Sequence, residues 1–197
     1  MKKQTRSGVF ETNSSSVHTL SIRKNKNSNL IWDVLRGMSD DNNGVLKAGI
    51  TKVEEVKNII CEDVLDISQL PIQTTIDILF YGCFSDCDMI CDVFDKISKF
   101  ISVFEKHGIT IETSVNEISK SYNEMVWLFT DDLKITELLK KSCSLEEGIE
   151  QILSSERCVY TCYEDDTACG CPSDIEEVYN EFSNIPENEK ITASERC

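Results

Sequence analysis

Apolar residues recur with helical spacing in several segments of the chain. The longest example follows Ser85 and ends before Gly108, a residue type that commonly terminates helices. Its apolar side chains recur at intervals of three and four residues and would form one stripe: Ile90, Phe94, Ile97, Phe100, Ile101 and Phe104. This pattern predicts a helix of about twenty residues that buries one face.

Helix starts are indicated by Ser or Thr followed three residues later by an acid, because such residues can cap each other's backbone N–H groups. The pattern occurs at Thr51–Glu54, Ser85–Asp88, Ser114–Glu117, Ser144–Glu147 and Ser173–Glu176. Helical spacing continues through 115–129, and further helices are predicted for 131–141 and 145–154. Residues 71–82, PIQTTIDILFYG, fit either a helix that opens at Pro71 or a buried strand.

Alternating apolar and polar positions predict several strands. Residues 8–12 and 17–23 are expected to form a hairpin around three serines, and 108–113 and 157–164 to form two more strands. In the second arm of the hairpin, one face carries His18, Leu20 and Ile22, and the other carries Val17, Thr19 and Ser21. In 157–164, one face carries Cys158, Tyr160 and Cys162.

These elements together predict an α+β protein. We expect a helix-rich single domain over residues 1–185, with a small antiparallel sheet that includes the N-terminal hairpin. A chain of 197 residues is long enough to bury a sizeable core. Residues 186–197 contain few apolar side chains, so they are expected to form a flexible acidic tail.

Charge is distributed unevenly along the chain. The formal net charge is −15, but residues 1–27 carry six basic residues against Glu11 alone, so the remainder carries −20. Such an acidic chain would repel nucleic-acid phosphates, which argues against broad nucleic-acid binding. A small anion would bind near the basic N-terminus, whereas the acidic remainder either engages a basic protein partner or serves solubility.

Neither a secretory signal nor a membrane-spanning segment is indicated. The start MKKQTRSGVFETN lacks an apolar core region, and no apolar stretch is long enough to cross a bilayer. We therefore expect a cytoplasmic protein without a membrane partner. In that reducing compartment the ten cysteines would be core residues, metal ligands or reactive thiols.

The segment TNSSSVH, residues 12–18, places hydroxyls, an amide and an imidazole between two apolar runs. One interpretation is a structural turn beside a buried histidine. A second is a site for an anion or nucleotide, in which turn amides and hydroxyls donate to the ligand and His18 donates or exchanges a proton. The ligand-binding residues would be Asn13, Ser14, Ser15, Ser16 and His18, with Arg6 or Arg23 supplying charge. In a third interpretation, His18 activates Ser16 as a nucleophile.

Residues 8–18, GVFETNSSSVH, resemble the N-terminus of a group of uncharacterised proteins from bacteriophages and related mobile elements of Gram-positive bacteria. That group carries a Phe-Glu-Thr-Asn-Ser-Ser-Ser-x-His-Ser pattern after a short basic start, and Thr19 stands here in place of its last serine. The match covers about seventeen residues and implies an origin for the chain but no reaction.

Two groups of cysteines have spacings that suggest chemistry. Four thiolates within fourteen residues are candidates for a structural zinc site on a hairpin over 155–173: Cys158, Cys162, Cys169 and Cys171. Their alternatives are apolar core positions or a redox-active pair. Cys83, Cys87 and Cys91 are four residues apart, which fits a helical core stripe or, less simply, an iron–sulfur cluster.

The sequence supports two hypotheses of different kinds. In the first, the serine-rich segment binds a phosphate-bearing small molecule or another anion, with or without a reaction. In the second, the chain is a non-enzymatic interaction or inhibitor protein whose acidic surface engages a basic surface on a host or phage protein.

Overall fold

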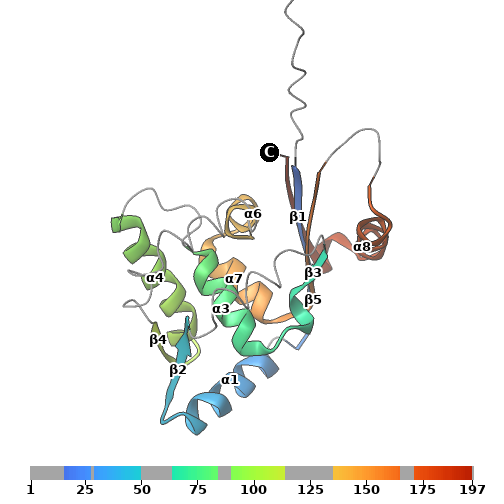
Figure 1. Cartoon of the computed structure of the whole chain (residues 1–197). Helices are drawn as coiled ribbons and strands as arrows, with labels where there is room; N and C mark the ends of the chain where they lie inside the picture. Colours follow the sequence, from blue (N-terminus) through green and yellow to red (C-terminus); the bar gives the residue numbers. More distant parts are fainter. Residues whose placement is uncertain are drawn as a thin grey trace, which may run out of the picture.

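The protein contains a four-stranded antiparallel sheet with helices on both of its faces (Figure 1). The computed structural model describes residues 16–27, 29–49, 64–83, 90–113, 135–164 and 171–196. The strand order is β3-β5-β1-β6. The strands are β1 (Ser16–Lys24), β3 (Val64–Asp66), β5 (Ser155–Glu164) and β6 (Lys190–Arg196). This arrangement confirms the predicted α+β class and antiparallel sheet.

The helices divide between the two faces of this sheet. Helix α8 (Ser173–Ser183) covers one face, and the other faces α3 (Ile72–Gly82), α6 (Ile135–Ser142) and α7 (Leu145–Leu153) (Figure 1). Farther from the sheet lie α1 (Asn29–Asp41), α4 (Ile90–Glu105) and a parallel pair of short strands, β2 (Val45–Ala48) and β4 (Thr110–Thr113). Two short 3-10 turns, η1 (Ile67–Gln69) and η2 (Glu187–Glu189), precede α3 and β6.

The alternation in β1 and β5 assigns residues to the two faces as the sequence predicts. Leu20, Ile22, Cys158 and Tyr160 belong to the larger hydrophobic core with the helices α3, α6 and α7. On the opposite face, Val159 packs in a smaller cluster with residues of α8 and with Ile185. We call the side that faces the larger core the inner face of the sheet, and the side that faces α8 the outer face.

Strand β1 is central in this sheet and has two partners from the far end of the chain. From Val17 to Arg23 it pairs with β5 along one edge and with β6 along the other, antiparallel in both cases. Both edges of this stretch are therefore occupied, which leaves neither for the hairpin partner predicted at residues 8–12. Those residues lie outside the described ranges.

The prediction of a flexible tail over 186–197 is wrong. Lys190–Arg196 forms β6, and its register with β1 runs from Val17↔Arg196 to Arg23↔Lys190. On the inner face of β6, Ala193 is 7% exposed and Ile191 is half-buried. These two side chains are sufficient to pack the strand against the core. An edge strand obtains much of its order from backbone hydrogen bonds and needs few apolar residues, and its charged side chains discourage pairing with other chains.

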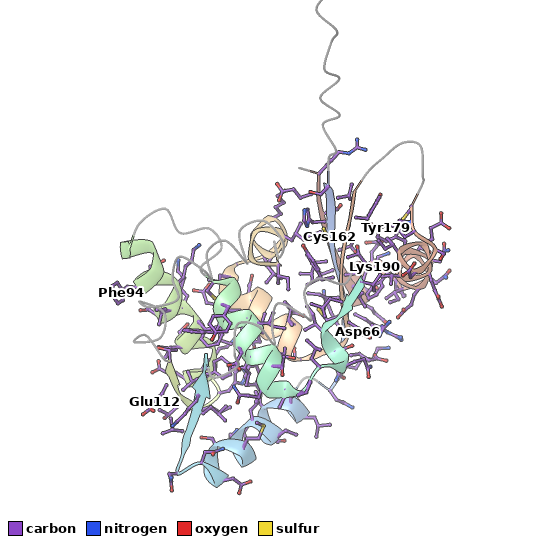
Figure 2. All side chains as sticks on the ribbon, viewed as in Figure 1. Asp66, Phe94, Glu112, Cys162, Tyr179 and Lys190 are labelled. Carbon is purple, nitrogen blue, oxygen red and sulfur yellow. The ribbon has the colours of Figure 1, made fainter. Side chains whose placement is uncertain are left out.

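Several helix predictions are confirmed. Helix α4 follows the long apolar stripe, and Gly108 just after it has a φ of 74°. The stripe is not wholly buried, since the ring of Phe94 extends outward from α4 and is 57% exposed (Figure 2). Residues 72–82 form a helix and not a strand.

Of the predicted capping patterns, Ser144–Glu147 is a complete capping box at the start of α7. The one at Ser173–Glu176 is not formed, because α8 begins after Pro172, which makes no side-chain cap. The predicted starts at 51–54, 85–88 and 114–117, and the helix predicted for 115–129, lie outside the described residues. No helix in the described part of the chain has the length and apolar composition needed to cross a membrane.

Candidate functional site

The start of β1 brings His18 into a chain of hydrogen bonds on the inner face. Ser16 is the first described residue, and Arg6, Asn13, Ser14 and Ser15 lie outside the described ranges. The Ser16 Oγ lies 2.9 Å from His18 Nε2, and His18 Nδ1 lies 2.6 Å from the Tyr160 hydroxyl. Ser16 and His18, the two predicted catalytic residues, are thus in direct contact.

Burial differs sharply along this chain of contacts. His18 and Tyr160 are each 1% exposed, whereas Ser16 is half-buried. The imidazole therefore lies in a low-dielectric environment with both nitrogens within hydrogen-bonding distance of a hydroxyl, and Ser16 directly follows residues 12–15 in the sequence. Such a buried polar network is ordered because an unpaired ring nitrogen there would carry a desolvation cost.

Two proton arrangements satisfy these distances. In one, Nδ1–H donates to the Tyr160 oxygen, so Nε2 accepts the Ser16 hydroxyl proton. In the other, the Tyr160 O–H donates to Nδ1, and Nε2–H donates to Ser16. Only the first leaves Nε2 with a lone pair that can act as a base toward its neighbours. The order hydroxyl, imidazole, orienting hydroxyl matches the general arrangement of a nucleophile, its base and a group that fixes the base.

Cross-strand neighbours add a thiol and a carboxylate at the level of His18. Cys162 on β5 and Glu195 on β6 are its direct partners in the two ladders, so all three project from the inner face. The Cys162 Sγ lies 3.9 Å from His18 Nε2. Glu195 forms an ion pair of 2.9 Å with Lys141 of α6. Figure 2 labels Cys162 on the sheet and Tyr179 toward α8, where the Tyr179 hydroxyl lies 3.2 Å from Thr19 Oγ1 of the outer face.

Arg23, predicted to supply charge to an anion, does not lie beside His18. It is five residues along β1, about 16 Å in an extended strand, and the alternation places it on the outer face. Its guanidinium is ion-paired with Glu156 at 3.4 Å. The positive charge of Arg23 therefore pairs with a carboxylate at the other end of the strand and does not lie beside His18.

The four candidate zinc ligands are not gathered by the described structure. Cys158 and Cys162 lie on one continuous strand, and four residues of strand separate them by about 13 Å, too far for one zinc ion with Zn–S bonds of about 2.3 Å. Cys171 contacts Tyr163, an outer-face residue of β5, and Cys169 lies outside the described ranges. Within those ranges, no group of three or more His, Cys, Asp or Glu side chains is arranged to hold a metal ion.

The stripe predicted for Cys83, Cys87 and Cys91 is divided between elements. Cys83 is the C-cap of α3, fully buried, and its thiol donates to the Leu79 carbonyl, whereas Cys91 belongs to α4. Cys87 lies outside the described residues. Cys83 therefore serves the core, as the simpler interpretation predicts for this position.

Sequence reasoning missed three participants of the site. Tyr160 was placed on the correct face but not paired with His18, because 142 residues separate them. The sequence presents Cys162 as a zinc ligand, a core position or half of a redox-active pair, but gives no sign that it lies beside His18. Glu195 falls in the predicted tail, because its acidic side chain between Ser194 and Arg196 gives no local sign of a strand.

Comparisons with known proteins give no family to which this site can be assigned. No protein-family model, no curated protein and no solved structure matches the chain significantly.

Proposed function

We propose that this chain is a cytoplasmic protein of bacteriophage or mobile-element type that binds a phosphate-bearing small molecule or another anion where the serine-rich segment enters β1. His18 would act there as a hydrogen-bond donor or proton exchanger. The proposed phage or mobile-element origin rests on the resemblance of residues 8–18. The proposed class of ligand is inferred from the hydrogen-bonding groups around His18.

The observation that carries the proposal is the hydrogen-bonded chain Ser16–His18–Tyr160. When the imidazole takes up a proton, both ring nitrogens become donors, and the tyrosine and serine oxygens become acceptors. The resulting positive charge lies behind a half-buried serine that directly follows Ser14 and Ser15. An anion contacting Ser16 would favour this charged form, and its release would favour the neutral one.

We expect anions to stabilise the protein against unfolding through this site. A ligand at a hundred times its dissociation constant raises the free energy of unfolding by about 2.7 kcal/mol. The measurement is thermal unfolding of the wild type, Ser16→Ala and His18→Gln in the presence of ATP, NAD, phosphate or sulfate. At least one of these should raise the Tm of the wild type, and both variants should lose most of the shift.

The matched control is Arg23→Gln, which removes a charge from the same strand about 16 Å away on the outer face. It should retain the ligand-induced shift of the wild type. An equal shift in wild type and His18→Gln would refute the role of His18, and no shift with any of the four anions would refute the site.

A second function is favoured by the composition of α8. This helix has no Lys or Arg, and its solvent side carries Asp174, Glu176 and Glu177 in exposed positions, while Ile175, Val178 and Phe182 pack on the sheet. We propose, as the alternative, that this acidic surface engages a basic surface on a host or phage protein. A helix face with one sign of charge attracts such a partner electrostatically.

For this alternative, we expect Glu176→Gln/Glu177→Gln to weaken binding of a lysine-rich peptide measured by calorimetry at low salt. Exposed ion pairs contribute roughly 0.2–1 kcal/mol each, so the loss of two should lower the affinity about two- to thirtyfold. Glu105→Gln/Glu112→Gln removes the same charge from exposed positions on α4 and β4 and should change the affinity less. Glu112 lies near the opposite end of the molecule from α8 (Figure 2). Equal losses in both double variants would show that only net charge matters.

A further inference from the structure

We propose that Cys162 and His18 form a reactive thiol–imidazole pair that attacks small electrophiles at carbon. The two residues are direct partners in the β1–β5 ladder, and both project from the inner face. The Sγ lies 3.9 Å from Nε2, within reach of a sulfur hydrogen bond. This inference goes beyond anion binding and does not depend on it, because a neutral electrophile suffices to test it.

The surroundings orient His18 as the base. Its Nδ1 contacts the buried Tyr160 hydroxyl at 2.6 Å, and donation from Nδ1–H to that oxygen makes Nε2 the acceptor nitrogen, with both the Ser16 hydroxyl and the Cys162 thiol within reach of it. Cys162 is partly buried where it packs against the larger core, while His18 is 1% exposed, so the thiol is less enclosed than the base. Tyr160 is thus a positioning residue, since it acts on the thiol only through the imidazole.

Ser16 faces the same nitrogen but is the weaker candidate for the nucleophile. Its Oγ is closer, at 2.9 Å, yet a thiol gives up its proton to imidazole far more readily than an aliphatic hydroxyl does. The serine also lies on the ligand side of the site proposed above. We therefore assign the nucleophile to Cys162.

Cys143, Cys158 and Cys171 lie in environments that suppress the reactivity of a thiol. Burial raises the pKa of Cys158 far above its usual value. Burial also raises the pKa of Cys143, with a further contribution from Glu147, and that of Cys171, with Glu176 adding to it. Because the thiolate is the reactive form, Cys143 and Cys171 serve as internal references of ordinary or low reactivity.

The charged groups near the pair come from two further elements. Glu195 of β6 lies opposite His18 in the other ladder, and Lys141 of α6 forms an ion pair with it. The positive and negative charges of Lys141 and Glu195 offset each other, which leaves the imidazole as the group positioned to take the thiol proton.

The reaction is a substitution at an electrophilic carbon of an activated acyl or alkyl compound. The S–H bond of Cys162 breaks as its proton moves to His18 Nε2, and a bond forms between Sγ and the carbon. The bond from that carbon to its leaving group breaks, and the leaving group departs with the electron pair. His18 then returns its proton to the leaving group or to water, so no external oxidant or reductant is needed.

The test is alkylation of the full chain by iodoacetamide, with the rate at each cysteine measured by peptide mass spectrometry from pH 5 to 9. We expect Cys162 to react at least about tenfold faster than Cys143 and Cys171 at pH 7, since one unit of pKa corresponds to tenfold in thiolate. His18→Gln should slow Cys162 about tenfold and move its pH profile toward that of an ordinary thiol. Arg23→Gln, on the outer face at the other end of β1, should leave the rate unchanged.

Tyr160→Phe keeps the ring and removes the hydroxyl that orients His18, so it provides a second test if His18→Gln does not fold. It should slow Cys162 and shift its pH profile, with unchanged rates at Cys143 and Cys171. A Cys162 rate equal to that of Cys171 in the wild type, or unaffected by both variants, would overturn the proposal. Anion-induced stabilisation is measured separately, so either proposal can fail alone.

Discussion

Ala193→Asp is expected to lower the free energy of unfolding by about 2–5 kcal/mol, the cost of placing a polar or charged group in an apolar site without a partner. Ala193 is 7% exposed, pairs with Leu20 across the ladder and faces the larger core. Because whole domains have stabilities of about 5–15 kcal/mol, this one change should be visible in any denaturation experiment.

The effect should depend on pH in a defined direction. In the folded protein, burial raises the pKa of the new carboxyl above its unfolded value of about 3.9. The folded state then binds more protons than the unfolded state, so stability falls as pH rises above about 4. The loss should level off once pH exceeds the raised pKa of the folded state. Urea denaturation followed by circular dichroism at pH 4 and pH 7 measures both values.

Thr192→Asp is the matched control, because it introduces the same side chain one residue earlier on the exposed, outer side of β6. It should change the free energy of unfolding by no more than about 1 kcal/mol. If residues 186–197 were a flexible tail, the two substitutions would have equally small effects. That result would contradict the strand.

The local periodicity of the sequence predicts elements well where one face is buried. His18, Leu20 and Ile22 lie on one face of β1 as expected, and α4 and α7 follow their apolar stripes. Residues 72–82 remained ambiguous because α3 is buried around most of its circumference, so no polar face marks its period. The sequence does not predict helix α1, because its apolar residues do not form one buried stripe. Leu30 and Val34 are exposed, whereas Trp32 and Leu35 are buried.

Strand pairing lies beyond such patterns. The hairpin was predicted from nearness in sequence, but β1 pairs with β5 and β6, about 140 and 170 residues away. Strand β6 has little apolar content because it fills an edge position and contributes one fully inward side chain, Ala193. No local signal distinguishes such an edge strand from a polar tail.

Because local patterns do not show strand pairing, the sequence predicts only part of the candidate site. Ser16 and His18 share a strand with a spacing of two, so their contact follows from alternation alone. Tyr160 and Cys162 reach His18 only through the β1–β5 ladder. Arg23 was selected for its charge and nearness in sequence, but an odd spacing of five in a strand places it on the opposite face.

Trp32→Ala should have the other large effect, a loss of about 3–5 kcal/mol in the free energy of unfolding, as for other buried tryptophans. Trp32 is 2% exposed and packs edge-on against Phe104 of α4, with ring centroids 6.1 Å apart. Its other aromatic partner is His107, stacked at 3.7 Å with an angle of 5° between the rings. One side chain thus joins α1 to the end of α4.

His107 continues the contact from Trp32 to Glu150 of α7. The loss in the free energy of unfolding should therefore exceed that from the buried surface of the tryptophan alone. His107 Nε2 lies 3.1 Å from Glu150, and Lys106 binds the same carboxylate at 2.7 Å. Burial alone would raise the pKa of Glu150, but hydrogen bonds and charges from these two residues outweigh it and lower the pKa. Removing the indole admits water to this group and weakens its hydrogen bonds.

Leu30→Ala on the same helix is the control for Trp32→Ala, because Leu30 is 66% exposed. It should cost less than about 1 kcal/mol, since little area is removed from a buried environment. Urea denaturation followed by far-ultraviolet circular dichroism compares the two without relying on the fluorescence of the tryptophan that is removed. Equal losses would mean that α1 does not pack through Trp32, whereas a large difference would establish this indole as the contact that fixes α1 on α4.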